Sequence, residues 1–236
     1  MKVLFSLKEK EISSINKNLF NDILSYLREN NLDSDRISSA ELSKVLKNPP
    51  VLTPEEFAQE IIYVILASGF SQRTAIKKWR EIMNEINSNG ANFDELIQIF
   101  KNQTKIKSIV KAWENKKEFR DGFYNLRNEN RPLQEQVDYL ETIPYIGKTT
   151  KNHLARNLGI SIVKYDVWIQ RLGIALKYPE LSKKETETLI KFPVTDDVKV
   201  ICDDIFNSLE EQTGESRGFI DVILWKACQL EILSIK

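Results

Sequence analysis

The chain has 236 residues and a mass of 27.4 kDa, with 42% hydrophobic and 29% charged residues, a composition typical of a soluble globular protein with one large domain or two intimate ones. Its two cysteines, Cys202 and Cys228, exclude a disulfide scaffold, a four-cysteine zinc site and an iron–sulfur cluster, and its single histidine, His153, argues against a zinc hydrolase or a Ser-His-Asp enzyme. The 34 basic and 34 acidic residues balance, so net charge alone indicates no polyanionic partner.

The spacing of apolar residues predicts helices along most of the chain, because they recur at three- and four-residue steps. Pro49-Pro50 closes an N-terminal helical region. Thr53 then begins the next helix as its N-cap, with Pro54 at the first helical position and Glu56 completing a capping box. Further along we predict helices at residues 53–69, 74–86, 93–100, 105–113, 131–142, 149–158, 167–177, 183–192, 195–211 and 218–233. The predicted fold class is all-α, with about ten helices joined by short connections.

A tight connection between two helices is predicted around Gly147. Pro144 ends the first helix, and Gly147 permits the turn and the close approach of a ligand to the backbone. The N–H groups at the start of the second helix, together with Lys148 and the hydroxyls of Thr149 and Thr150, suit an anion. The segment thus indicates a helix–hairpin–helix, which grips phosphates without reading base sequence, but by itself it fits an ordinary helix–turn–helix corner equally well.

Asp166 lies at the expected start of the helix at residues 167–177, where the helix dipole stabilises a negative charge. Its simplest role is that of an N-cap.

Charge is unevenly distributed along the chain. Residues 101–120 hold seven basic and two acidic residues, residues 141–177 hold six and two, and residues 178–236 hold seven and twelve. A basic middle segment is expected if one face meets phosphate, although ordinary solvated helix faces would give the same pattern.

Together these features resemble the helix–hairpin–helix DNA glycosylase superfamily, whose members pair such a hairpin with a catalytic aspartate. Four further segments resemble elements of that family in the same order. Residues 65–75 are similar to its "LLSQQT" helix end, 100–109 to its "yNsKAknI" element, 153–159 to the end of the second hairpin helix in some 8-oxoguanine glycosylases, and 222–228 to its closing helix. The resemblance covers about residues 53–235, whereas residues 1–50 match no motif.

The resemblance implies a two-lobed helical DNA glycosylase fold with a cleft between the lobes. We expect residues 1–52 to be an N-terminal helical extension that forms part of the second lobe. Residues 53–177 are expected to form a six-helix lobe that contains the hairpin at about residues 140–158, and residues 178–236 to complete the second lobe.

The resemblance also assigns roles to residues. It makes Asp166 the catalytic carboxylate, which fits the chemistry because glycosidic cleavage builds positive charge on the sugar, and a nearby carboxylate stabilises that charge and orients a water. Gln72 matches family side chains that fill the gap left by an extruded base, although a plain solvent-exposed loop residue is as good an interpretation. The expected DNA-binding residues are Gln72, Tyr145, Gly147, Lys148, Thr149 and Thr150, and Tyr165, Trp168 and Trp225 are the base-pocket candidates, whose spacing also fits a packed core.

The chain departs from the family at the hairpin. Bifunctional members carry a Schiff-base lysine two residues after the second glycine, where this chain has Thr149, which cannot form an imine. We therefore expect a monofunctional enzyme that leaves an abasic site. Lys148 is the alternative amine, although its side chain points about 100° further round the helix. Tyr145 replaces the usual first glycine of the turn and either stacks on a sugar or base or covers the hairpin.

The expected function is that of a DNA N-glycosylase that removes an alkylated or oxidised purine from duplex DNA by base flipping and Asp-assisted hydrolysis. A non-catalytic duplex-binding module of the same fold, or an enzyme acting on hypermodified viral bases, is the alternative. We expect no required cofactor, no metal and no iron–sulfur cluster, with a monovalent cation at the hairpin carbonyls as the one optional ion. The expected partner is double-stranded DNA with a flipped base, bound by a cytoplasmic, nucleoid-associated monomer without membrane segments.

Overall fold

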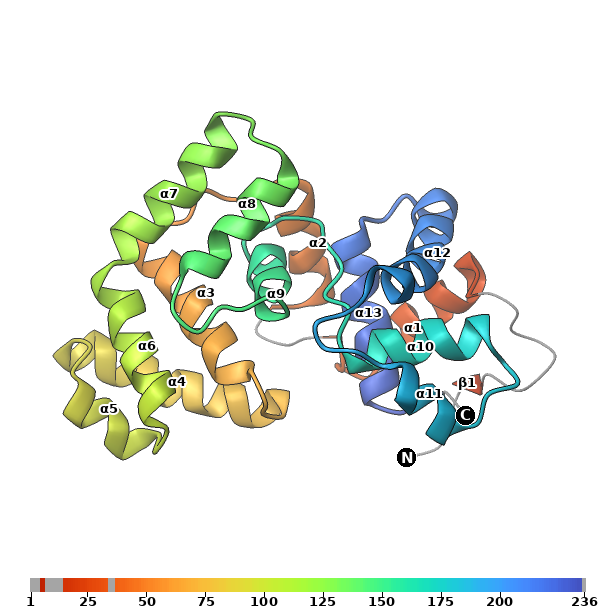
Figure 1. Ribbon diagram of the computed structural model, residues 1–236, viewed down its shortest axis with the longest axis horizontal. Coiled ribbons are helices and arrows are strands. Elements are labelled where there is room, and N and C mark those ends of the chain that lie inside the picture. Colours follow the sequence, from red (N-terminus) through yellow and green to blue (C-terminus); the bar gives the residue numbers. More distant parts are fainter. Residues whose placement is uncertain (1–4, 7–14, 34–36, 235–236) are drawn as a thin grey trace. The chain divides into compact units, whose positions relative to one another are not determined.

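The computed structural model describes residues 5–6, 15–33 and 37–234, and it divides into two compact units (Figure 1). The hairpin unit is the continuous segment Pro50–Leu158. The terminal unit combines Met1–Pro49 with Gly159–Lys236. The described residues are predominantly helical, which confirms the predicted all-α class. None of the described helices is long and apolar enough to cross a membrane.

The hairpin unit is built around one helix that the capping chemistry predicted. Its elements are α3 (Pro54–Ala67), α4 (Gln72–Asn89), α5 (Phe93–Ile99), α6 (Gln103–Glu114), α7 (Lys116–Asn128), α8 (Leu133–Tyr139), the 3-10 helix η1 (Leu140–Thr142) and α9 (Thr150–Asn157). Thr53 Oγ1 accepts the N–H of Glu56 at 3.2 Å, and Glu56 Oε2 accepts the N–H of Thr53 at 2.8 Å, which is the predicted capping box at the start of α3. The continuous run of residues 61–66 is buried because α3 contacts α4, α6, α7 and α9.

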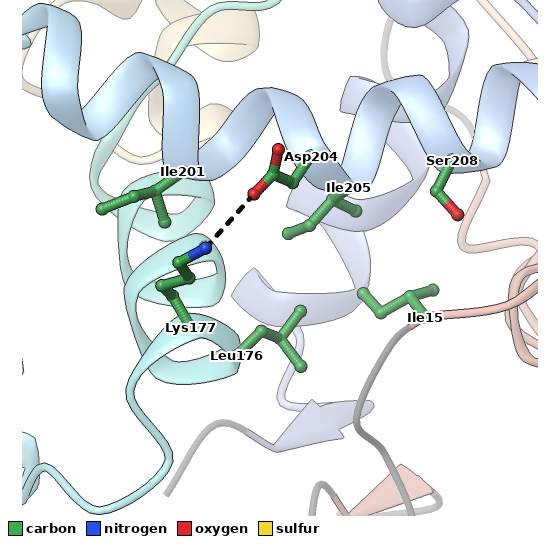
Figure 2. A pocket seen from close by; sticks show the side chains of 8 residues that line it. Ile15, Leu176, Lys177, Ile201, Asp204, Ile205 and Ser208 are labelled. Atoms are coloured by element: carbon green, nitrogen blue, oxygen red, sulfur yellow. Dashed lines mark ion pairs between the residues drawn. The ribbon is translucent and has the colours of Figure 1, made fainter.

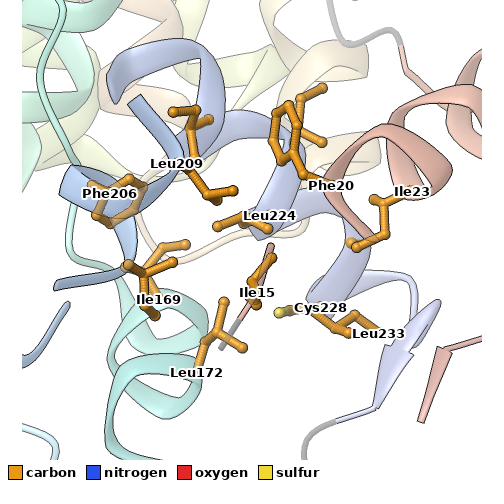
Figure 3. Close-up of a cluster of buried hydrophobic side chains, with 14 of the residues drawn as sticks. Ile15, Phe20, Ile23, Ile169, Leu172, Phe206, Leu209, Leu224, Cys228 and Leu233 are labelled. Atoms are coloured by element: carbon orange, nitrogen blue, oxygen red, sulfur yellow. The ribbon is translucent and has the colours of Figure 1, made fainter. Parts of the chain in front are cut away.

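The terminal unit joins the two ends of the chain in one core. Its elements are β1 (Phe5–Ser6), α1 (Lys17–Glu29), α2 (Ser39–Lys47), α10 (Val167–Lys177), α11 (Lys183–Leu189), α12 (Asp196–Thr213), α13 (Arg217–Gln229) and β2 (Leu233–Ser234). The two short strands pair in parallel, with Phe5 opposite Leu233. Most residues of its core come from α1, α10, α12 and α13, and Figure 3 shows among them Phe20, Ile23, Ile169, Leu172, Phe206, Leu209, Leu224 and Cys228.

Two features of the fold differ from the sequence prediction. Helix α7 was not predicted, because most of its residues are polar, Asn115 gives it no side-chain cap, and Gly122 in its middle has low helix propensity. A Cβ at position 122 would clash with Tyr139, so close packing against α8 explains that glycine.

The second difference is the boundary between the two units. Residues 53–177 were expected to form one lobe, but the segment from Gly159 onward belongs to the terminal unit. That segment includes α10, which packs on α12 and α13.

Candidate functional site

The predicted hairpin is present in the hairpin unit as α8, η1, a turn and α9. Within the turn, Ile143 N–H donates to the carbonyl of Leu140 at 3.2 Å, and Ile146 N–H to that of Ile143 at 3.0 Å. Gly147 N–H donates to Thr150 Oγ1 at 2.8 Å, and Lys151 N–H donates to the Gly147 carbonyl at 2.9 Å. These bonds fix the backbone between the two helices in one conformation.

The residue with unusual backbone geometry is Tyr145, not Gly147. Tyr145 has φ +72°, in the left-handed region that favours glycine, which explains why a glycine would be the ordinary choice at this position. Gly147 has no such φ, and no heavy atom lies within 4 Å of the position that its Cβ would occupy. The turn therefore does not need glycine at position 147 for a left-handed backbone conformation. The missing side chain of Gly147 instead leaves exposed backbone open to a ligand.

The start of α9 has the groups that an anion requires. Lys148 is exposed, and within the described part of the chain the N–H groups of Lys148 and Thr149 donate to no protein acceptor. Thr149 is the N-cap of α9 but makes no side-chain capping bond, so its hydroxyl also remains available. Thr150 is different, because its Oγ1 is engaged with Gly147. Two backbone donors, one hydroxyl and one ammonium group thus lie along one short segment.

Lys151 joins the two arms of the hairpin. Its Nζ lies 2.5 Å from Asp138 Oδ1 on α8 and 2.6 Å from Glu141 Oε1 on η1, with 14% of the side chain exposed. The hydrogen bond from Lys151 lowers the pKa of the Asp138 carboxyl. Lys151 is therefore committed to the hairpin's own structure and is not a free cation for a ligand.

A buried lysine lies beneath the hairpin turn. Lys105, on α6, is only 2% exposed, and its Nζ lies 5.5 Å from the centroid of the Tyr145 ring. Burial lowers its pKa to about 8. Lys105 was not predicted as a site component, because its burial depends on the packing of α3 on α6. The signal available in the sequence was the position of Lys105 four residues before Ile109, on the apolar face of α6.

Asp166 lies in the terminal unit, at the start of α10. Its Oδ1 accepts the N–H groups of Trp168 at 2.9 Å and Ile169 at 3.2 Å, so the predicted N-cap is present. Its Oδ2 lies 3.7 Å from Lys164 Nζ, and 13% of the Asp166 side chain is exposed. One carboxylate oxygen thus holds the helix start while the other faces a cation.

Lys164 is a component of this site that sequence analysis missed. Besides its contact with Asp166, its Nζ lies 5.8 Å from the centroid of the Trp225 ring on α13. Cys228 lies on α13, one turn beyond Trp225. Burial raises the pKa of its thiol, and the charge of the nearby Asp166 raises it further. The signal available in the sequence was the place of Lys164, two residues before the predicted catalytic aspartate.

The three base-pocket candidates have different surroundings. Tyr165 is buried in the core of the terminal unit, and its hydroxyl donates to Asp203 Oδ1 at 2.6 Å, so burial and this bond raise its pKa. Its ring is therefore committed to packing. Trp168 is half-buried with the Arg171 guanidinium 4.8 Å from its ring centroid, and Trp225 is half-buried beside Lys164. A pocket role for these two tryptophans stays a prediction.

Gln72 and His153 are placed as follows. Gln72 is the first residue of α4, with Ser71 as N-cap, and not a loop residue as expected, because α4 begins two residues earlier than predicted. His153 is buried, and its ring packs edge-on against Tyr63 at 5.8 Å.

The structure also contains a small pocket in the terminal unit, which Figure 2 shows between α10 and α12. It has a volume of about 230 Å³, below the usual size of a ligand pocket, and Lys177 Nζ lies 3.7 Å from Asp204 Oδ2 at its edge. None of the predicted site residues lines it. Among the described residues, no three His, Cys, Asp or Glu side chains are grouped as a metal site would require.

Comparison with known proteins identifies the fold. No protein-family model and no curated protein matches the sequence. The crystal structure of an 8-oxoguanine DNA glycosylase from Methanocaldococcus jannaschii is similar, with a TM-score of 0.58 and 21% identity over 88% of this chain and 92% of that one. An 8-oxoguanine glycosylase/lyase of the same organism, in complex with a 15mer DNA containing 8-oxoguanine, gives a TM-score of 0.58 and 19% identity over 90% of this chain and 98% of that one. The chain has the helical fold of these DNA glycosylases.

Proposed function

We propose that this protein is a DNA N-glycosylase that removes a damaged purine from duplex DNA, with Asp166 as its catalytic carboxylate. The observation that carries the proposal is the geometry of Asp166 in a chain with this fold. Its Oδ1 is held by two backbone N–H groups, whereas Oδ2 lies 3.7 Å from the Lys164 ammonium. A carboxylate fixed in this way is preorganised to act on a substrate.

The mechanism follows from the charge that develops during the reaction. As the bond between base and sugar breaks, positive charge builds on the sugar, and the Asp166 carboxylate stabilises it and orients the attacking water. The target nucleotide must leave the stack to reach this carboxylate, so the reaction requires base flipping. Oxidised guanine is the first substrate to test because both similar structures are described as 8-oxoguanine glycosylases, and an alkylated purine is the second.

The hairpin would hold the DNA backbone. The donors of Lys148 and Thr149, beside the open face of Gly147, suit one phosphate group, and the exposed Tyr145 ring lies beside them. Thr150 would contribute by fixing the turn through its bonds to Gly147, and Gln72 would contact DNA from the first turn of α4. We expect a monomer bound to double-stranded DNA in the cell interior, with the nucleoid as its place of action.

Strand cleavage by a Schiff base is not expected from the hairpin, because Thr149 stands where the amine would be. Two lysines are the alternatives if cleavage occurs. Lys148 is adjacent to Thr149 and exposed, and Lys164 has its Nζ near the Asp166 carboxylate.

The direct test is a nicking assay on end-labelled duplexes that each carry one altered base, with and without hot alkali. The panel contains 8-oxoguanine, an alkylated purine, uracil, 5-hydroxymethyluracil and hypoxanthine. We expect cleavage of a purine-lesion duplex only after alkali. Cleavage without alkali would overturn the monofunctional mechanism, and borohydride trapping of Lys148→Ala and Lys164→Ala would then identify the amine.

A non-catalytic duplex-binding module is the second candidate, favoured by the N-cap bonds of Asp166, which give that residue a structural role. Binding to every duplex in the panel, with no base released from any, would support that candidate or an enzyme for hypermodified viral bases. A duplex that carries a glucosylated base separates these two.

A further inference from the structure

Phe70 is an exposed aromatic side chain on the short loop between α3 and α4. Its side chain is 44% exposed, and the chain reverses just before it at Gly69, which has φ +78°. An exposed phenylalanine by itself is unremarkable in a soluble protein. What separates Phe70 from other exposed apolar residues is the support beneath its ring.

That support is the buried ammonium group of Lys105. Its Nζ lies 4.7 Å from the centroid of the Phe70 ring and 5.8 Å from that of Phe100. The same nitrogen donates to the carbonyl of Ser68 at 2.5 Å and lies 3.5 Å from that of Leu66, at the C-terminal end of α3. Phe100 in turn packs edge-on against Phe70, with 5.6 Å between the ring centroids. Phe70 is therefore held from below by a cation and from the side by a second ring.

The cluster also includes the hairpin. The Tyr145 ring, 38% exposed, lies 5.5 Å from the same Lys105 nitrogen. One buried cation thus contacts an exposed ring of the α3–α4 loop and an exposed ring of the hairpin turn. Both rings also adjoin the start of a helix, α4 for Phe70 and α9 for Tyr145.

We propose that Phe70 is the side chain that enters the base stack of bound duplex DNA, and that Lys105 is the positioning residue that fixes its ring. This inference rests on the proposed function, because it assigns Phe70 to the gap that an extruded base leaves. An apolar ring replaces the lost stacking contacts of a base better than an amide does, and proteins that kink DNA insert such side chains. Gln72, in contrast, is polar and is held in the first turn of α4.

The buried ammonium group of Lys105 explains why the Phe70 ring can insert into the base stack at little cost. A ring that is already fixed loses little side-chain freedom when it inserts, so more of the stacking free energy appears as affinity. The ammonium group beneath it also places positive potential close to the phosphates that flank the gap.

The experiment compares the dissociation constants of two duplexes of one sequence, one intact and one with a tetrahydrofuran abasic analogue. Wild type is expected to prefer the gapped duplex. Phe70→Ala should lower that preference about tenfold with little change in affinity for the intact duplex, within the range of base–aromatic stacking contributions. Val51→Ala removes another exposed apolar side chain of the hairpin unit, outside the hairpin itself, and serves as the matched control. An unchanged preference in Phe70→Ala, or a loss found in Gln72→Ala instead, would overturn the assignment.

The positioning role of Lys105 is tested by the same comparison, the dissociation constant for the intact duplex divided by that for the gapped duplex. Lys105→Met should lower the preference for the gapped duplex, and Lys105→Arg, which keeps a cation, should restore part of it. An equal loss of affinity for both duplexes in Lys105→Met would mean a merely structural role. If thermal unfolding shows that Lys105→Met does not fold, Phe100→Leu tests the positioning by weakening the same cluster, with the same two outcomes.

These readouts need no turnover, so they separate this inference from the proposed activity. If the wild-type protein prefers the gapped duplex but releases no base, the inference about Phe70 stands and the proposed activity is contradicted. A protein that releases base but binds both duplexes equally contradicts the inference alone.

Discussion

Asp166 combines an N-cap role with the proposed catalytic role, and the two are separable by substitution. Asparagine is as good an N-cap as aspartate, so Asp166→Asn should unfold at nearly the wild-type denaturant concentration. Asp166→Ala should lose about 1 kcal/mol of unfolding free energy, because the N–H groups of Trp168 and Ile169 lose their acceptor. Urea denaturation of the two variants measures this difference. Equal stability of both would show that the capping bonds contribute nothing.

Lys105 should respond to pH in a range where other lysines do not. Because burial lowers its pKa to about 8, the folded protein loses this proton between pH 8 and the ordinary lysine value of 10.5, whereas the unfolded chain keeps it. In that window the unfolded chain binds more protons, so Lys105 makes stability rise with pH. The expected result is a rise in wild type relative to Lys105→Met between pH 8 and pH 10. A constant difference between the two proteins across this window would contradict the lowered pKa.

Loss of the same Lys105 proton should weaken the cluster that Phe70, Phe100 and Tyr145 form around this lysine. Above about pH 8 the amine is neutral, and its cation–π contacts with Phe70 and Tyr145 weaken. The preference for a gapped duplex should then fall in wild type and persist in Lys105→Arg, whose guanidinium stays charged. The Lys105→Arg variant retains Tyr145, so it also controls for any contribution of that ring.

At the scale of elements, the ion pairs of Lys151 should determine how firmly α8 and η1 are held to α9. Lys151→Met should lower the free energy of unfolding by about 1–2 kcal/mol at pH 7, between the values for exposed and buried pairs. Because the hydrogen bond from Lys151 lowers the pKa of Asp138, this contribution is present above the unfolded carboxyl pKa and is lost as pH falls through the folded value. The wild-type and variant proteins should therefore converge in stability as the pH falls well below the ordinary aspartate pKa of 3.8. A difference that persists there would contradict the ionic origin.

Sequence patterns predicted those elements whose signals are local. The capping box of α3 depends on Thr53 and Glu56 alone, and the N-cap role of Asp166 follows from its place before an apolar helix. Helix α7 was missed because tertiary contacts, not capping or propensity, stabilise it. The burial of Lys105 was harder to predict, since it results from the packing of α3 on α6. The left-handed φ of Tyr145 is instead a local feature of the turn, at the position where the family has its first glycine.

At the scale of the whole molecule, the fold was identified from a few motifs although the two similar structures share only 21% and 19% identity with the chain. The boundary of the hairpin unit was less predictable. A continuous run of helices gives no signal of which unit α10 joins, and its packing on α12 and α13 decides that.

DNA affinity should depend on salt if, as proposed, the hairpin binds phosphates. Log Kd should change linearly with log salt, and Lys148→Ala should reduce the slope by about 0.9, the value for one phosphate contact. The variant should weaken binding equally on every sequence. Lys183→Ala removes an exposed lysine at the start of α11 and is the matched control. A flat salt response in wild type would contradict binding through phosphates.

The central claim is that Asp166 catalyses base release, and single-turnover release of the preferred base by wild type and Asp166→Asn tests it most directly. The variant keeps the N-cap and the shape of the side chain but lacks the negative charge. We predict that its rate falls by at least about 10³-fold, in the range lost when one electrostatic group is removed from an active site, while its DNA dissociation constant stays within about twofold. A variant that releases base at the wild-type rate would contradict the assignment of Asp166.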